Sequence, residues 1–202
     1  MNDKKYLLRE FYQLCDGGVC QDLLTEQEKM DVRNGAMILT GIAQRADYKN
    51  QNGRVYPYEI LAREVENYKK LVRENRSIGE CDHPDNTVIS LQNASHKITD
   101  IWWNGKDVMV KLKVLSGVPG QQLRSLVNDG VAIGLSSRGL GSVRETREGL
   151  MVESDFNLIC FDIVSEPSTQ GAFMGLMESK QPLVWKKEDR IQRALNEVLF
   201  RK

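Results

Sequence analysis

Two runs of alternating apolar and polar residues, joined by Asn104-Gly105, place the strongest constraint on what this chain can fold into. The runs span residues 97–103 and 107–115. In the second run four apolar side chains fall on one face and two lysines on the other, as in a strand with one buried face. An Asn-Gly pair between two such runs is typical of a tight β-hairpin. A pair of antiparallel strands is therefore the most firmly predicted element of the fold.

Further elements are predicted on both sides of this hairpin. Helices are predicted from about Pro57 to Glu74 and over 121–128 and 186–202, and a short one near the N-terminus, where apolar residues between Leu7 and Leu14 fall on one face. Strands are predicted over 35–45, 131–137, 143–147 and 149–164. Because hairpins rather than crossover helices connect most strands, we expect an α+β architecture around an antiparallel sheet or small barrel.

Length and charge narrow the class of protein. The chain has 202 residues, enough for one domain with a sizeable core. Its 28 basic and 28 acidic residues balance, which argues against nucleic-acid binding through bulk charge. Every apolar run is shorter than the roughly 18 residues that a membrane span needs. The four cysteines include one closely spaced pair only, so we expect free thiols and no structural zinc site.

Two short segments supply the residue types of a serine hydrolase. Residues 79–84 read GECDHP and contain His83, one of only two histidines in the chain. Residues 134–142 read GLSSRGLGS. Histidine is the usual general base at neutral pH, and a serine hydroxyl needs such a base to act as a nucleophile. The two segments therefore point to nucleophilic catalysis more directly than anything else in the chain.

The serine pair raises the question of which hydroxyl reacts. Ser136 ends an apolar run and precedes a predicted bend at Gly139 and Gly141. Strand alternation sends Ser136 and Ser137 to opposite faces, so only one of them can face the histidine. Backbone amides between Ser137 and Gly139, or in the loop after Pro167, are candidates for binding an oxyanion. The alternative is a serine pair that merely caps a turn.

Asp162 is the candidate for the group that orients the base. It is a lone carboxylate within an otherwise apolar strand, and a buried carboxylate is costly unless it is paired. A hydrogen bond to the histidine would satisfy it and fix the useful tautomer. Other carboxylates compete for this role, namely Glu80, Asp82 and Glu166.

Two rival arrangements use the same residues. His96 is the only other histidine, and it lies just ahead of a predicted hairpin strand, which makes it the weaker candidate base. A metal hydrolase would need Asp82, His83, Asp85 and His96 as ligands, and their spacing matches no such motif. We expect no metal.

The motifs resemble those of the prohead core proteases of T-even-type tailed phages, which are relatives of the herpesvirus assemblin-like serine peptidases. The resemblance covers residues 35–178. The matching strings are NGRVYP at 52–57, GECDHP at 79–84, IWWNG at 101–105, GLSSRGLGS at 134–142 and DIVSEPS at 162–168.

By position, the resemblance implies that Ser136 is the nucleophile, His83 the general base and Asp162 the residue that orients the base. It implies an α+β fold, a partly open antiparallel β-barrel or sheet flanked by helices, and no cofactor. It also implies procapsid maturation: such proteases lie in the scaffold core inside the procapsid, in the host cell cytoplasm, and cleave scaffold or core proteins and the major capsid protein. Assemblin relatives often dimerise, so a homo-oligomer fits the resemblance, whereas a nucleic-acid or membrane partner is not expected.

The family tends to cut after glutamate, where a large aliphatic residue stands two positions earlier and a small residue follows. Leu176-Met177-Glu178-Ser179 fits this pattern, so we expect self-cleavage between Glu178 and Ser179. Binding a glutamate needs a cationic subsite, for which Arg138 and Arg54 are candidates by placement. The predicted organisation is an N-terminal arm at 1–34, a protease domain at 35–178 and a C-terminal helical tail at 179–202. The alternative is a non-catalytic capsid-assembly protein that binds scaffold through the same fold.

Overall fold

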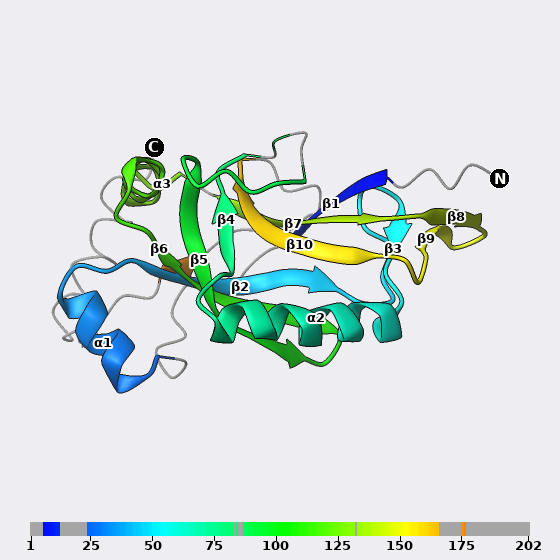
Figure 1. Ribbon diagram of the computed structural model, residues 1–202, viewed down its shortest axis with the longest axis horizontal. Coiled ribbons are helices and arrows are strands. Elements are labelled where there is room, and N and C mark those ends of the chain that lie inside the picture. The colour runs from blue at the N-terminus through cyan, green and yellow to red at the C-terminus, as the bar shows by residue number, and fades with distance from the viewer. Residues whose placement is uncertain are drawn as a thin grey trace, which may run out of the picture.

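The computed structural model describes residues 6–12, 24–82, 84, 87–131, 133–165 and 175–176. Within these ranges the chain forms three helices and three sheets, an α+β architecture with most strands antiparallel (Figure 1). No helix in the described part of the chain is long and apolar enough to cross a membrane.

The largest sheet has five strands in the order β11-β2-β6-β5-β4. Its centre is the hairpin predicted from the sequence, in which β5 ends at Asn104 and β6 begins at Asp107. Gly105 in the turn has a φ of 60°, a conformation that glycine adopts without strain. The strands are β2 (Ile38–Arg45), β4 (Ile78–Glu80), β5 (Ala94–Asn104), β6 (Asp107–Val114) and β11 (Gly175–Leu176).

A three-stranded sheet in the order β1-β7-β10 carries the serine pair. Its strands are β1 (Tyr6–Tyr12), β7 (Gly134–Gly141) and β10 (Asn157–Val164). A second small sheet, β3-β9-β8, lies at the end of the molecule opposite α1 and α3 (Figure 1). Its strands are β3 (Arg54–Val55), β8 (Val143–Thr146) and β9 (Gly149–Val152).

The five-stranded sheet and the serine-bearing sheet meet along β4 and β10. Cys81 forms a parallel bridge to Ile163, and the Asp82 amide donates to the Ile163 carbonyl at 2.7 Å. On the other side, β1 lies beside β2. The sheets thus wrap round one core but remain open rather than closing into a barrel, which confirms the predicted α+β fold with its partly open arrangement of strands.

Each helix covers a different part of this frame. The helices are α1 (Glu26–Arg33), α2 (Tyr58–Arg73) and α3 (Val118–Asn128). Thr25 begins α1 with a capping box to Glu28, which satisfies backbone amides that a helix start leaves unpaired. α2 packs on β5 and β10, and α3 packs on β5 and β6.

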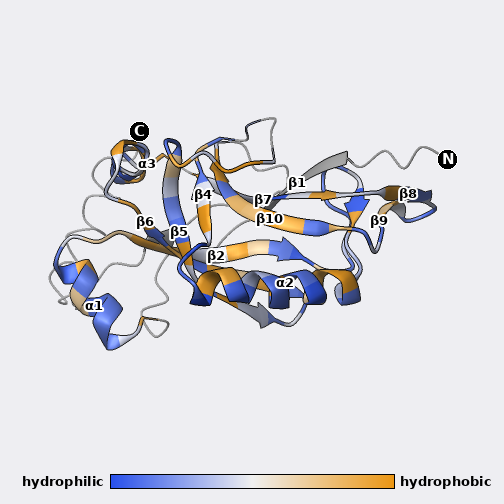
Figure 2. Ribbon diagram, viewed as in Figure 1, coloured by the Kyte–Doolittle hydropathy of each residue, from blue (hydrophilic) through white to orange (hydrophobic). Residues whose placement is uncertain are grey.

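The hydrophobic core is continuous between α2, the five-stranded sheet and the β1-β7-β10 sheet. Tyr68 of α2 packs edge-on against Phe161 of β10, with ring centroids 5.1 Å apart, and Tyr56 packs against Phe156 in the same way at 5.2 Å. Figure 2 shows hydrophobic residues along β2 and β10 and on part of α2, whereas α1 is mostly hydrophilic. Burying one strand face and one helix face in this way is what the alternating and helical patterns in the sequence encode.

Two sequence-based expectations were wrong. The N-terminal apolar residues form strand β1 rather than a helix, because the edge of β7 offers this segment a ladder from Tyr6↔Gly141 to Tyr12↔Leu135. The predicted bend at Gly139 and Gly141 is also absent from the structure, since both glycines lie within β7. The predicted helix over 186–202 and the tail at 179–202 lie outside the described residues.

Candidate active site

Ser136 lies in β7, the central strand of the β1-β7-β10 sheet, rather than at a strand end. It is completely buried. Ser136 is paired in the antiparallel ladders with Phe11 of β1 on one side and with Asp162 of β10 on the other. Directly opposed residues in an antiparallel ladder point to the same face. The two candidate catalytic residues Ser136 and Asp162 are therefore neighbours on one face of the sheet.

Ser137 points to the other face of the same strand. It opposes Phe161, whose ring packs against Tyr68 of α2. The Ser137 hydroxyl is buried and has no hydrogen-bond partner among the described residues. This face belongs to the apolar core, so the geometry separates the two serines as alternation predicts.

The glycines after the serine pair serve packing. A Cβ at Gly139 would overlap the Phe156 ring and the Asn157 carbonyl, and one at Gly141 would press on the Phe156 backbone. β7 is paired with both β1 and β10 over this stretch, so its amides lie in two ladders. The arrangement does not present Ser137 and Gly139 as an exposed bend that could hold an oxyanion.

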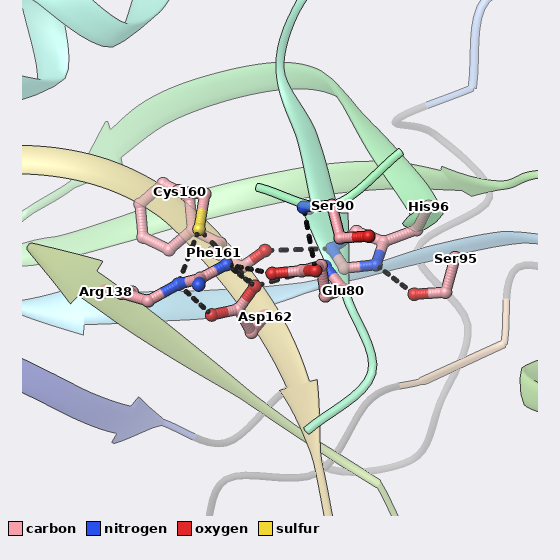
Figure 3. Close-up of polar contacts among 8 residues, drawn as sticks. All are labelled: Glu80, Ser90, Ser95, His96, Arg138, Cys160, Phe161 and Asp162. Carbon is pink, nitrogen blue, oxygen red and sulfur yellow. Dashed lines mark hydrogen bonds and ion pairs between the residues drawn. The ribbon is translucent and has the colours of Figure 1, made fainter. Parts of the chain in front are cut away.

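Two nitrogen atoms of the Arg138 guanidinium contact the Asp162 carboxylate (Figure 3). Its Nε lies 2.9 Å from Oδ2 and its Nη2 donates to Oδ1 at 3.1 Å. Both side chains are fully buried. Such a two-point contact fits the planar guanidinium fork and fixes the plane of the carboxylate as well as its position. The carboxylate that the sequence singled out as needing a partner thus has a strong one.

Glu80 shares the same guanidinium. Its Oε2 lies 2.5 Å from Nη2 of Arg138, and its other oxygen accepts from the Ser90 amide at 3.0 Å. The backbone amide of Glu80 donates to Oδ1 of Asp162 at 3.1 Å. Glu80 stands at the end of β4, three positions before His83. The network therefore links the histidine segment to both strands of the serine site.

Cys160 completes the buried group. Its thiol accepts from Nε of Arg138 at 3.2 Å and donates to Oδ1 of Asp162 at 3.4 Å. Burial raises the pKa of the Cys160 thiol, and the Asp162 carboxylate raises it further. The thiol therefore stays neutral at physiological pH and acts as a weak hydrogen-bonding group rather than as a nucleophile.

His96, the weaker candidate base, is committed elsewhere. It is fully buried in β5, and its Nε2 donates to the Phe161 carbonyl at 3.0 Å. Its Nδ1 then accepts from the Ser95 hydroxyl at 2.9 Å. Burial lowers the pKa of His96 to about 4, although the Asp162 charge and the Phe161 carbonyl oppose that shift. The imidazole is neutral with both nitrogens occupied, which suits a structural role.

The packing around Gly79 explains why the GECDHP segment begins with a glycine. A Cβ there would overlap the Phe161 carbonyl and the His96 ring. Only glycine lets the His96 ring reach past β4 to β10. This close approach, and the Glu80 network beside it, are functions of the segment that sequence reasoning missed. The signal in the sequence was an arginine two residues after Ser136, which strand alternation places on the same face as that serine.

Not all of the predicted site residues belong to the described part of the chain. His83, Asp85, Glu166, Glu178 and Ser179 lie outside the described residues. In the part of the chain that is described, no three His, Cys, Asp or Glu side chains gather closely enough to hold a metal ion.

The structure excludes one of the two arginines predicted to bind a substrate glutamate. Arg138 is fully buried between two carboxylates. Arg54 lies in β3 and pairs with Leu150 of β9, at the end of the molecule toward which β7 runs after Ser136 (Figure 1). We therefore withdraw Arg138 as the cationic subsite, and Arg54 stays a prediction.

Comparisons with known proteins agree with this reading of the fold and its motifs. The family model described as "Prohead core protein serine protease" matches residues 14–181. The chain belongs to this family. The match begins after β1 and includes both the histidine and the serine segments.

Two further comparisons, both with phage T4, support the assignment. The chain is 35% identical over 143 residues to the prohead core protein protease of Enterobacteria phage T4, covering 68% of each chain. The solved structure of the bacteriophage T4 capsid assembly protease, gp21, superposes with a TM-score of 0.69 at 31% identity, covering 82% of this chain and 100% of that one. The resemblance inferred from the motifs is thus confirmed at the level of family and fold.

Proposed function

We propose that this protein is a serine endopeptidase that acts inside the phage prohead, with Ser136 as nucleophile, His83 as general base and Asp162 as the residue that orients the base. The observation that carries the proposal is the placement of Ser136 opposite Asp162 on one face of the β7–β10 ladder. Membership in the prohead core protease family supplies the reaction class and the setting.

The chemistry follows the residues. His83 takes the proton from the Ser136 hydroxyl as its oxygen attacks the scissile carbonyl, and then gives it to the leaving amine. Water then hydrolyses the acyl-enzyme. His83 takes a proton from the attacking water and returns a proton to the Ser136 oxygen as the acyl group leaves. Asp162, held rigidly by Arg138, favours the histidine tautomer that accepts a proton and stabilises the imidazolium that forms.

Ser136 is anchored in a strand paired on both sides. A nucleophile on a rigid element keeps its geometry better than one on a loop. Since the amides of β7 lie in ladders, we propose that the oxyanion is bound by backbone groups of the loop after Pro167.

We further propose that the substrates are scaffold or core proteins and the major capsid protein, cut after glutamate. Arg54 is the remaining candidate for the cationic subsite that binds this glutamate, because Arg138 is buried between two carboxylates. Self-cleavage between Glu178 and Ser179 would remove residues 179–202. Such cleavage suits a site near the end of a domain, where backbone is commonly accessible to proteases.

The test is incubation of the wild-type chain with a prohead scaffold protein beside the Ser136→Ala variant. We expect cleavage by wild type only, with new C-termini at glutamate in the mass spectra. A Glu178→Gln variant should keep residues 179–202 while still cleaving added scaffold. Scaffold that stays intact with wild type, or that is cut equally by Ser136→Ala, would contradict the proposal.

A further inference from the structure

The buried network around Arg138 joins three separate segments of the chain. Arg138 lies on β7, Asp162 on β10 and Glu80 at the end of β4 (Figure 3). All three side chains are at most 1% exposed. The network lies where the five-stranded sheet meets the β1-β7-β10 sheet, next to the bridge between Cys81 and Ile163.

Charge is not balanced among these three side chains. Two carboxylates share one guanidinium, so the group carries one net negative charge when all three are ionised. Removing charges from water is costly, and apolar residues of similar volume would often be at least as stabilising. A fold that needed only to join β4 to β10 would therefore gain little from this arrangement, which favours a role in the reaction.

The contacts of Arg138 and Glu80 converge on the Asp162 carboxylate. Arg138 contacts both oxygens of Asp162, and the Glu80 backbone amide donates a further hydrogen bond to Oδ1. Glu80 in turn holds Nη2 of Arg138, while the Ser90 amide fixes its second oxygen. Glu80 therefore acts on Asp162 both directly, through its backbone, and indirectly, through the guanidinium.

From these contacts we propose that Glu80 and Arg138 are positioning residues for the protease reaction: they hold the Asp162 carboxylate in one orientation opposite Ser136. This inference rests on the proposed function, because it assigns a supporting role to residues around the same site. Neither residue touches the substrate. Lysine cannot replace Arg138, since a single ammonium lacks the fork that grips both carboxylate oxygens.

A double-mutant cycle tests whether Glu80 acts through Asp162. The variants are Glu80→Gln, Asp162→Asn and the two together, each compared in kcat and KM on a scaffold substrate, with long incubations to resolve the residual rate of Asp162→Asn. Glutamine has the shape of glutamate but lacks its charge. We expect Glu80→Gln to lower kcat about tenfold in the wild-type background and to change KM less than about twofold, a coupling typical of one salt-bridge network.

In the Asp162→Asn background, Glu80→Gln should then lower kcat by less than about twofold. Equal losses in both backgrounds, or no loss in either, would overturn the positioning role. Arg138→Lys is a second test of the positioning role. We expect it to lower kcat at least as much as Glu80→Gln does, with little change in KM. A wild-type kcat in this variant would also overturn the positioning role.

The matched control is Glu28→Gln. Glu28 forms an ion pair with the buried Lys111 at 2.8 Å, between α1 and β6, away from the serine strand. We expect this variant to lose thermal stability but to keep the wild-type kcat. A kcat loss like that of Glu80→Gln would show that any lost buried ion pair lowers the rate and would overturn the proposal. A wild-type chain that cleaves no scaffold contradicts both proposals, whereas an active wild type with additive losses contradicts positioning alone.

Discussion

Ser136 and Asp162 are directly opposed residues of adjacent antiparallel strands. In such a pair the Cβ atoms lie about 4.5–5.5 Å apart. The pairing brings together, through backbone register alone, two residues that are 26 positions apart in the sequence. A shift of one residue in this register would place Ser137 opposite Asp162 and turn Ser136 toward the core. The register of β7 against β10 is therefore what selects the nucleophile.

Substituting each serine in turn tests that selection. Ser136→Ala should abolish cleavage of scaffold, whereas Ser137→Ala should retain activity. Because the Ser137 hydroxyl is buried without a partner among the described residues, its removal should change the free energy of unfolding by no more than about 1 kcal/mol. Cleavage assays and denaturant titrations measure the two effects. Activity in Ser136→Ala and none in Ser137→Ala would move the nucleophile by one residue.

Gly79→Ala should destabilise the fold by about 1–3 kcal/mol or more, as overpacking does. The new methyl group would overlap the Phe161 carbonyl and the His96 ring, so β4 and β10 would have to separate. Thermal and denaturant unfolding measure the loss.

Gly117→Ala is the matched control for that experiment. Gly117 is the N-cap residue of α3 and has a negative φ of −67°. A methyl group added there would find its nearest neighbour, Pro119 Cδ, at 3.9 Å. We expect a cost below about 1 kcal/mol there. Equal costs at the two glycines would refute the close approach at Gly79.

His96 should make stability depend on pH. Its pKa is lowered from 6.5 to about 4 in the folded protein because of burial, so the unfolded chain binds a proton more readily. The stability that the neutral ring contributes is present above pH 6.5 and is lost as the pH falls toward 4. The full effect is about 3 kcal/mol. His96→Gln should remove this component from a plot of unfolding free energy against pH, and an unchanged slope between pH 6.5 and 4 would contradict it.

Local patterns predicted the hairpin and α2 well, because alternation and helical spacing record which face of each element is buried. The β1 segment was misjudged for a physical reason. Its apolar residues suit a helix face or a strand, and only the vacant edge of β7, far away in the sequence, decides between them. Likewise the glycines of β7 look like a bend until Phe156, which packs on them, is in place.

The candidate site was only partly predictable for the same reason. Asp162 stood out as a lone carboxylate in an apolar strand, and the need for a partner followed from burial. The identity of that partner did not follow, because Arg138 and Glu80 meet it only once β4, β7 and β10 have been assembled. Arg138 was instead interpreted as a substrate-binding residue, since an arginine beside a nucleophile fits either role in the sequence.

The central claim, that Ser136 is the activated nucleophile, is tested most directly by labelling the intact protein with a serine-directed organophosphonate and mapping the adduct by mass spectrometry. A neutral serine far from a base does not react at a useful rate, whereas a base-activated one does. We predict one adduct per chain, on Ser136, formed by wild type and absent from His83→Ala. An adduct on another residue, or undiminished labelling of Ser136 in His83→Ala, would contradict the account.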